Sequence, residues 1–175
     1  MLSNRSRIAR AWRFLATLTL SLAVLPATPA DAASAYHPDI AIGKGATVVG
    51  DDIGPNPKPA GQVMHGHIRP GQRVTYDLLY GNDSALTDNF FIEGCSGHGP
   101  FTITYREGGS DTTGYMTQPG GTILSVSGTS VRPVALRIRV ASNADLSERW
   151  ICTFPQQSMA DPLLTDTAKL ILRVR

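Results

Sequence analysis

The stretch Pro133-Val134-Ala135-Leu136-Arg137-Ile138-Arg139-Val140-Ala141, written PVALRIRVA, decides the fold of this chain. Its strongly apolar residues occupy every second position from Val134 to Val140, and Arg137 and Arg139 stand between the last of them. Successive side chains of a β-strand point to opposite faces, whereas an amphipathic helix repeats its apolar residues every three to four positions. The stretch therefore predicts a strand with one buried face and one solvated face.

Similar alternation recurs along the chain. It is clear from Val74 to Tyr80, and shorter segments of the same kind are expected at 39–42, 47–49, 62–68, 89–93, 102–105, 122–126, 149–154 and 170–174. Turn-forming residues, among 17 glycines and 12 prolines, separate nearly all of them. Short strands about a dozen residues apart are typical of an all-β, antiparallel two-sheet β-sandwich, with a closed barrel as the alternative. Residues 145–148 are predicted to form a short helical turn or a loop. The proline-rich residues 51–61 are predicted to form an ordered surface loop.

The N-terminus has the composition of a secretory signal peptide. Residues 1–13 carry four arginines and no acid, an apolar run fills 14–25, and Ala30-Asp31-Ala32 supplies a cleavage site, with 33–35 as the alternative. The apolar run is shorter than the roughly 20 residues that a membrane-spanning helix needs. We expect 1–32 to be removed, 33–37 to form a short N-terminal segment, and 38–175 to form one domain that is secreted or periplasmic and has no membrane anchor.

The net charge of the mature chain excludes some classes of partner. Removal of 1–32 takes four arginines and one aspartate from the 16 basic and 14 acidic residues, which leaves 12 against 13 and a formal charge of −1. Proteins that bind nucleic acid usually carry a basic excess or a run of Lys and Arg. We therefore expect no nucleic-acid partner.

Cys95 and Cys152 are the two cysteines of the sequence, and an even count in an oxidising compartment favours a disulfide. A bridge over nearly 60 residues would stabilise the fold by about 4 kcal/mol in the loop-entropy model. Cys95 lies in the stretch EGCSGHGPF, where His98 three residues later raises the alternative of thiol chemistry. The glycines and Pro100 favour a turn between two strands instead, and Trp150 is expected to pack near the bridge.

Several stretches of the chain carry a pattern when taken in order. They are PDIAI (38–42), VVGDDI (48–53), AGQ (60–62), PGQRVTYDLLYGNDS (70–84), TDNFFIEG (87–94), GPFTITY (99–105) and MADPLLTDTAKLIL (159–172). This PDxxI, GDxI, GQ and DPxxxDT order resembles one copy of a β-sandwich repeat of bacterial extracellular proteins, related to immunoglobulin and fibronectin type III modules. The resemblance implies a noncatalytic scaffold or binding module and transfers no active-site residues.

His65 and His67 are the candidate metal ligands. On a strand, two residues at this spacing share one face, so both imidazoles can approach one copper or zinc ion. Met64 and His98 or His37 could complete the site only if the fold brought them close to the pair. Asp51, Asp52, Asp83 and Asp88 offer oxygen ligands for calcium, but no D-x-D-x-D-G loop is present. Tyr76, Tyr80, Tyr105 and Tyr115 would mark a sugar-binding face only if they are exposed.

These observations favour a secreted, noncatalytic β-sandwich with a structural or interaction role. No enzyme activity and no cofactor are expected. The sequence does not identify a partner, and the kinds of partner to be expected are an extracellular or cell-surface protein or a glycan. The alternative is a small secreted protein that binds a metal or another ligand through the face that carries His65 and His67.

Overall fold

The computed structural model describes residues 36–50 and 62–175 of the 175-residue chain. The expected signal peptide, its cleavage sites and the expected surface loop at 51–61 lie outside the described residues. Over the described ranges, no helix is long and apolar enough to cross a membrane.

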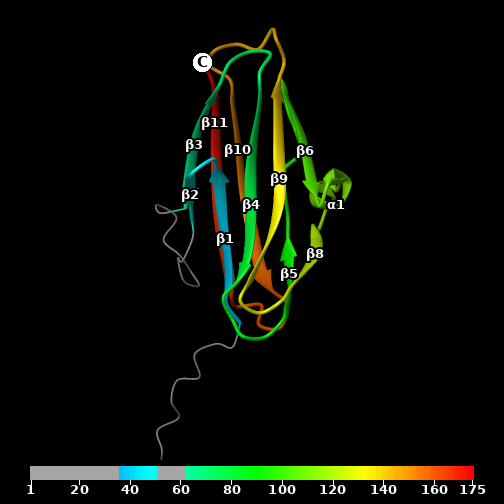
Figure 1. The fold of residues 1–175 in the computed structure, drawn as a ribbon. Helices are drawn as coiled ribbons and strands as arrows, with labels where there is room; N and C mark the ends of the chain where they lie inside the picture. The colour runs from blue at the N-terminus through cyan, green and yellow to red at the C-terminus, as the bar shows by residue number, and fades with distance from the viewer. Residues whose placement is uncertain (1–35, 51–61) are drawn as a thin grey trace, which may run out of the picture. The chain divides into compact units, whose positions relative to one another are not determined.

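The described chain consists mainly of β-strands (Figure 1). In chain order the elements are β1 (Pro38–Lys44), β2 (Thr47–Val49), β3 (Val63–Ile68), β4 (Arg73–Asn82), β5 (Asp88–Ile92), β6 (Phe101–Glu107), β7 (Ser110–Asp111), α1 (Thr113–Thr117), β8 (Thr122–Val126), β9 (Ser130–Val140), β10 (Arg149–Ser158) and β11 (Thr165–Val174).

The strands form two separate sheets. The front sheet has the order β2-β1-β4-β9-β6-β7, and the back sheet has the order β3-β11-β10-β5-β8. In Figure 1, β1, β4 and β9 lie in front of β11 and β10, and β1 contacts both of these back strands. This arrangement confirms the predicted β-sandwich and excludes the barrel.

One strand pair departs from the antiparallel expectation. The front sheet is antiparallel throughout, but in the back sheet β3 runs parallel to β11, with Met64 opposite Leu170 and Ile68 opposite Val174. No hairpin joins these two strands, because nearly a hundred residues of chain separate them. Alternating apolar residues show which face of a strand is buried but not the direction in which the strand runs.

The interior of the sandwich is formed by the faces that the alternation predicts. On β9, Val134, Leu136, Ile138 and Val140 are buried, and Arg137 and Arg139 are exposed. Large rings from both sheets fill the space between them, and full burial of such side chains stabilises a fold by about 1.5–3 kcal/mol each. The largest fully buried side chains are Trp150, Tyr76, Tyr80, Tyr105, Phe90 and Phe154.

Three of the stretches that carry the repeat-like pattern meet at the buried Asp166. Gln62 Nε2 donates to Asp166 Oδ1 at 2.6 Å, and the backbone nitrogen of Ile40 donates to Oδ2 at 2.8 Å. Burial raises the pKa of Asp166, and the hydrogen bonds from Gln62, Ile40 and Thr167 oppose this shift. The pattern thus has a physical basis in this chain, since PDIAI, GQ and DT supply the donors and the acceptor of one buried network.

The helix of the structure does not lie at residues 145–148, where the sequence allowed a short helical turn. Residues 145–148 form turns, with Glu148 N donating to Asp145 O at 3.1 Å, whereas the helix α1 was not predicted. It is a five-residue turn with Met116 buried and Tyr115 65% exposed. A helix this short has too few residues to show a 3.6-residue period, so tertiary packing decides it.

Candidate functional site

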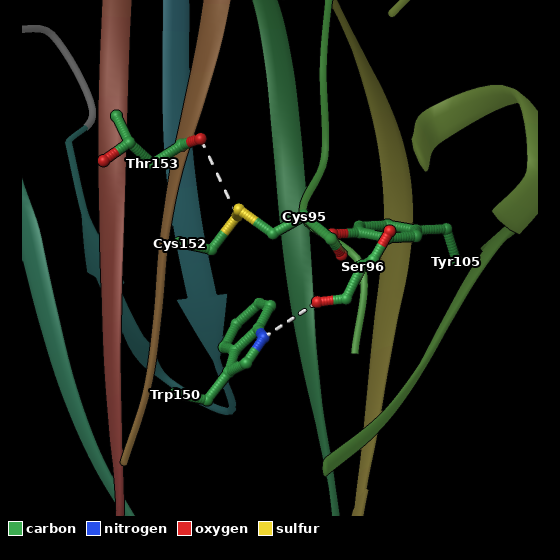
Figure 2. Close-up of a disulfide and its surroundings, with 6 residues drawn as sticks. All are labelled: Cys95, Ser96, Tyr105, Trp150, Cys152 and Thr153. Carbon is green, nitrogen blue, oxygen red and sulfur yellow. Dashed lines mark hydrogen bonds between the residues drawn. A yellow bond between two sulfur atoms is a disulfide. The ribbon is translucent and has the colours of Figure 1, made fainter. Parts of the chain in front are cut away.

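Cys95 and Cys152 form the predicted disulfide, with their Cα atoms 5.8 Å apart (Figure 2). Cys95 lies in the connection 93–100, which leaves β5 of the back sheet and enters β6 of the front sheet. Cys152 lies within β10. The bridge therefore ties this connection to the back sheet, and neither thiol is free for catalysis.

The EGCSGHGPF stretch is packed in place by two rings. Trp150 is fully buried and its indole Nε1 donates to Ser96 O at 3.2 Å, while Tyr105 Oη donates to Cys95 O at 3.0 Å (Figure 2). A Cβ at Gly94 would lie only 2.6 Å from Tyr105 Cζ, so this position requires glycine. The stretch connects two strands, as predicted, and the structure shows that these strands belong to different sheets.

His98 lies on this connection and is solvent-exposed. Its ring makes an edge-on contact with Phe101, with the ring centroids 6.2 Å apart. The structure thus gives His98 a local packing contact next to the start of β6.

His65 and His67 share the outward face of β3, and both are exposed. Met64 faces the interior, so it cannot join them as a third ligand, and this part of the sequence hypothesis is wrong. Across the described ranges, no three His, Cys, Asp or Glu side chains are grouped so that they could hold a metal ion.

The surroundings of His67 are positively charged. Desolvation lowers the pKa of His67 below its ordinary 6.5, and the positive charges of Arg175 and Arg173 lower it further. A lowered pKa keeps the imidazole neutral, as metal ligation requires. The same positive charges oppose the approach of a metal cation, however.

The burial of side chains bears on two other hypotheses from the sequence, a sugar-binding face formed by tyrosines and a calcium site formed by aspartates. Tyr76, Tyr80 and Tyr105 belong to the core and offer no sugar-binding rings at the surface. Asp51 and Asp52 lie outside the described residues, and Asp88 is buried, where it accepts a hydrogen bond from Ser158 Oγ.

An open groove of about 480 Å³ runs across the outer face of the front sheet, over β4, β9 and β6. Its polar lining consists of four arginines, Arg73, Arg106, Arg137 and Arg139, and three threonines, Thr75, Thr102 and Thr104. Arg106 donates a hydrogen bond to Gly109 O, and we refer to the other six residues as the arginine face.

The strand register sets the arginine face in two adjacent rows. In one row, Arg139 of β9 stands between Arg73 of β4 and Thr102 of β6. In the next, Arg137 stands between Thr75 and Thr104. Neighbouring strands lie about 4.8 Å apart and successive rows on one face about 6.7 Å apart, so all six side chains share one small area.

The three arginines of this face have no ion-pair partner among the residues that the structure describes. The ion pair that the structure does show joins Arg132 to Glu107, away from the groove. Asp77 is the one acid among the outward positions of β4, β9 and β6, and it lies in a third row beside Ala135. The arginine face therefore carries uncompensated positive charge.

The sequence alone does not identify the arginine face. The alternation in β9 places Arg137 and Arg139 toward solvent, but Arg73 lies more than 60 residues earlier, and only strand pairing brings it opposite Arg139. Like charges directly opposite each other on a sheet are destabilising, so their presence here calls for an explanation other than stability.

No protein-family model matches the sequence, and no match is found among curated proteins. Solved structures with a similar arrangement include the N-terminal domain of PorA, at 14% identity and a TM-score of 0.49, with 78% of this chain and 97% of that chain covered. A family 123 glycoside hydrolase from Clostridium perfringens shares 7% identity at a TM-score of 0.44, over 65% of this chain and 23% of that chain.

A third similar structure is BcpA, the major pilin subunit of Bacillus cereus, at 8% identity and a TM-score of 0.39. It is matched over 78% of this chain and 39% of its own length, so this chain spans well under two thirds of both the pilin and the hydrolase. All three TM-scores lie below 0.5, and the fold class rests on the two sheets of the chain itself. The specific bacterial repeat stays a prediction.

Proposed function

We propose that this chain is a secreted, noncatalytic β-sandwich module that acts by binding a partner at its surface. The observation that carries the proposal is the arginine face, where six polar side chains of three neighbouring strands line an open groove without internal charge compensation. Such a groove is shallow and open to solvent, which suits binding of an extended partner better than enclosure of a small substrate.

The disulfide and the N-terminal segment support the extracellular or periplasmic part of the proposal. Structural disulfides persist in oxidising compartments and are rare in the cytosol. Residues 1–32 have the charged, apolar and cleavage regions of a signal peptide in the required order.

Several polar groups of the interior take part in the packing of the sandwich. Asp166 accepts hydrogen bonds from Gln62 and Ile40, and the Tyr105 hydroxyl donates to Cys95 O. Burial raises the pKa of Tyr105 and of Tyr80. These groups hold the two sheets and their connections together, and the groove is lined by other residues.

Metal binding by His65 and His67 is the second candidate function. It is supported by their shared, exposed face on β3 and by the lowered pKa of His67. It ranks second because Arg173 and Arg175 place positive charge beside the pair.

The test uses the full chain, expressed in a bacterial host with its own leader. Mass spectrometry of the exported protein is expected to show a mature N-terminus at residue 33 or 36. Its mass is expected to be lower than that of the reduced form by two hydrogens, because the disulfide is formed. The exported protein is then incubated with extracellular polysaccharides and cell-surface extracts. Saturable binding without chemical change of the ligand is expected, whereas turnover of a bound ligand or a protein retained uncleaved in the cytosol would overturn the proposal.

A further inference from the structure

We propose that the arginine face binds a linear polysaccharide that carries carboxylate or sulfate groups. This inference rests on the proposed function and names the ligand class for the same surface. It follows from three features of the face: its charge, its lack of exposed rings, and its rows of threonine hydroxyls.

The charge of the face calls for an anionic ligand. Arg73, Arg137 and Arg139 are all exposed, and no described carboxylate forms an ion pair with any of them. A guanidinium presents its N–H donors in a planar fork that matches a carboxylate or a sulfate oxygen pair. An anion bound between Arg73 and Arg139 would also relieve the repulsion between these two side chains.

The absence of rings favours an anionic glycan over a nucleic acid or a neutral sugar. Proteins that bind single-stranded nucleic acid stack bases on aromatic side chains, and rings also form the apolar part of many binding surfaces. The aromatic residues of these strands, Tyr76, Tyr80, Phe101 and Tyr105, are all buried on the opposite side. The polar side chains that line the groove on the outer side carry guanidinium groups and hydroxyls.

The threonine hydroxyls would bind the sugar hydroxyls of the ligand. Thr102 ends the row that holds Arg73 and Arg139, while Thr75 and Thr104 flank Arg137. A hydroxyl can both donate and accept, which matches the hydroxyls of a sugar ring. A charged polysaccharide presents both anionic groups and hydroxyls along its length, and each of the two rows combines guanidinium and hydroxyl groups.

A second basic cluster is less suited to this role. Arg149 and Arg173 stand opposite each other on the back sheet, with Arg175 nearby. The loop that leads into Arg149 carries two acids, Asp145 and Glu148, close in sequence to this cluster. This cluster therefore provides a control that removes the same number of positive charges from another surface.

The experiment measures the Kd of the full, exported chain for four probes at physiological ionic strength. The probes are polygalacturonate, dextran sulfate, uncharged dextran and a short DNA duplex. Binding to polygalacturonate, to dextran sulfate or to both is expected, and the first two probes tell whether carboxylate or sulfate is the preferred group. Dextran is expected not to bind, and the DNA duplex to bind more weakly than the preferred polysaccharide.

Two triple variants decide where the polysaccharide binds. Arg73→Gln/Arg137→Gln/Arg139→Gln should weaken binding by roughly tenfold or more, because three charge-assisted contacts are lost. Arg149→Gln/Arg173→Gln/Arg175→Gln should change it by about twofold or less, since long-range attraction between exposed charges is screened by salt. Thermal unfolding of both variants checks that each is folded.

Equal losses in the two triple variants would show general electrostatic attraction and overturn the inference, as would preference for DNA or failure to bind either charged polysaccharide. If the first triple variant binds dextran or another uncharged partner with full affinity, the inference is overturned. The proposed function as a binding module would still stand in that case. New reducing ends released from a polysaccharide would instead contradict the proposed function.

Discussion

Arg73 of β4 and Arg139 of β9 stand directly opposite each other on the outer face of the front sheet, and neither forms an ion pair with a described carboxylate. Two positive charges in this position raise the free energy of the folded protein. The pair therefore costs stability, which a bound anion would restore.

The substitution Arg139→Gln should increase the free energy of unfolding by about 0.2–1 kcal/mol at low ionic strength, because it removes the repulsion with Arg73. The gain should shrink as salt is added. Urea unfolding at low and high salt measures both effects. As a control, Arg132→Gln breaks the ion pair with Glu107 and should shift stability in the opposite direction by about 0–1 kcal/mol. A loss of stability in Arg139→Gln at low salt would contradict this interpretation of the pair.

Removal of the disulfide should cost a large part of the stability. The bridge joins residues 57 apart, so Cys95→Ala/Cys152→Ala should lower the free energy of unfolding by about 4 kcal/mol. Denaturant unfolding of the oxidised protein and of the double variant gives the difference. Alkylation of the native protein by a thiol reagent before any reduction would show that the bridge is absent.

The position of Gly66 between the two histidines has a packing cause. A Cβ there would lie 2.0 Å from Tyr76 Oη and 2.9 Å from Leu172 Cδ1, inside the sandwich. Tyr76 is fully buried, so a shift of its ring would disturb the packing of the core around it. Gly66→Ala should therefore destabilise the protein by about 1–3 kcal/mol.

Gly114 supplies the matched control for this substitution. It lies in α1, and a Cβ at this position would have no atom within 4 Å, so Gly114→Ala should stabilise the protein by about 0.5–1 kcal/mol. Thermal or urea unfolding compares the two variants. Equal stability of the two would refute the close packing of β3 against Tyr76.

Asp166 should make stability depend on pH. Because burial raises its folded-state pKa above the ordinary 3.8, the folded protein retains a proton that the unfolded chain releases as the pH passes 3.8. The contribution of Asp166 to stability is thus greatest below pH 3.8 and falls as the pH rises through the raised folded-state pKa.

The variant Asp166→Asn cannot ionise and lacks this dependence. The free energy of unfolding of the wild type minus that of Asp166→Asn should therefore fall as the pH is raised from 3.8. A urea unfolding series across acidic and neutral pH measures the difference. A difference that stays constant, or that grows with pH, would show that the hydrogen bonds from Gln62 and Ile40 outweigh desolvation.

Zinc or copper should bind the wild type no more tightly than His65→Ala/His67→Ala. The pair shares one face of β3, but Arg173 and Arg175 surround it with positive charge. Isothermal titration of both proteins with each metal makes the comparison. Clearly tighter binding by the wild type would make metal binding the better functional assignment for that face.

The sequence by itself determined the strands, the faces that they bury and the disulfide. The alternation in PVALRIRVA is local, since a period of two sorts Val134 and Arg137 to opposite faces whichever strand lies alongside. Cys95 and Cys152 could be paired because no other cysteine is present. The packing of Trp150 near the bridge followed from its place two residues before Cys152 on the same strand.

Only the tertiary structure decided which strands pair and which side chains from distant segments lie next to each other. Hydrogen bonds between distant segments set the register that places Arg73 opposite Arg139, and the alternation within either strand carries no information about its neighbour. The same holds for the parallel pairing of β3 with β11 and for the network at Asp166. The formal charge of −1 that is expected after removal of 1–32 gave no sign of a basic surface, because net charge sums over residues that folding separates onto different faces.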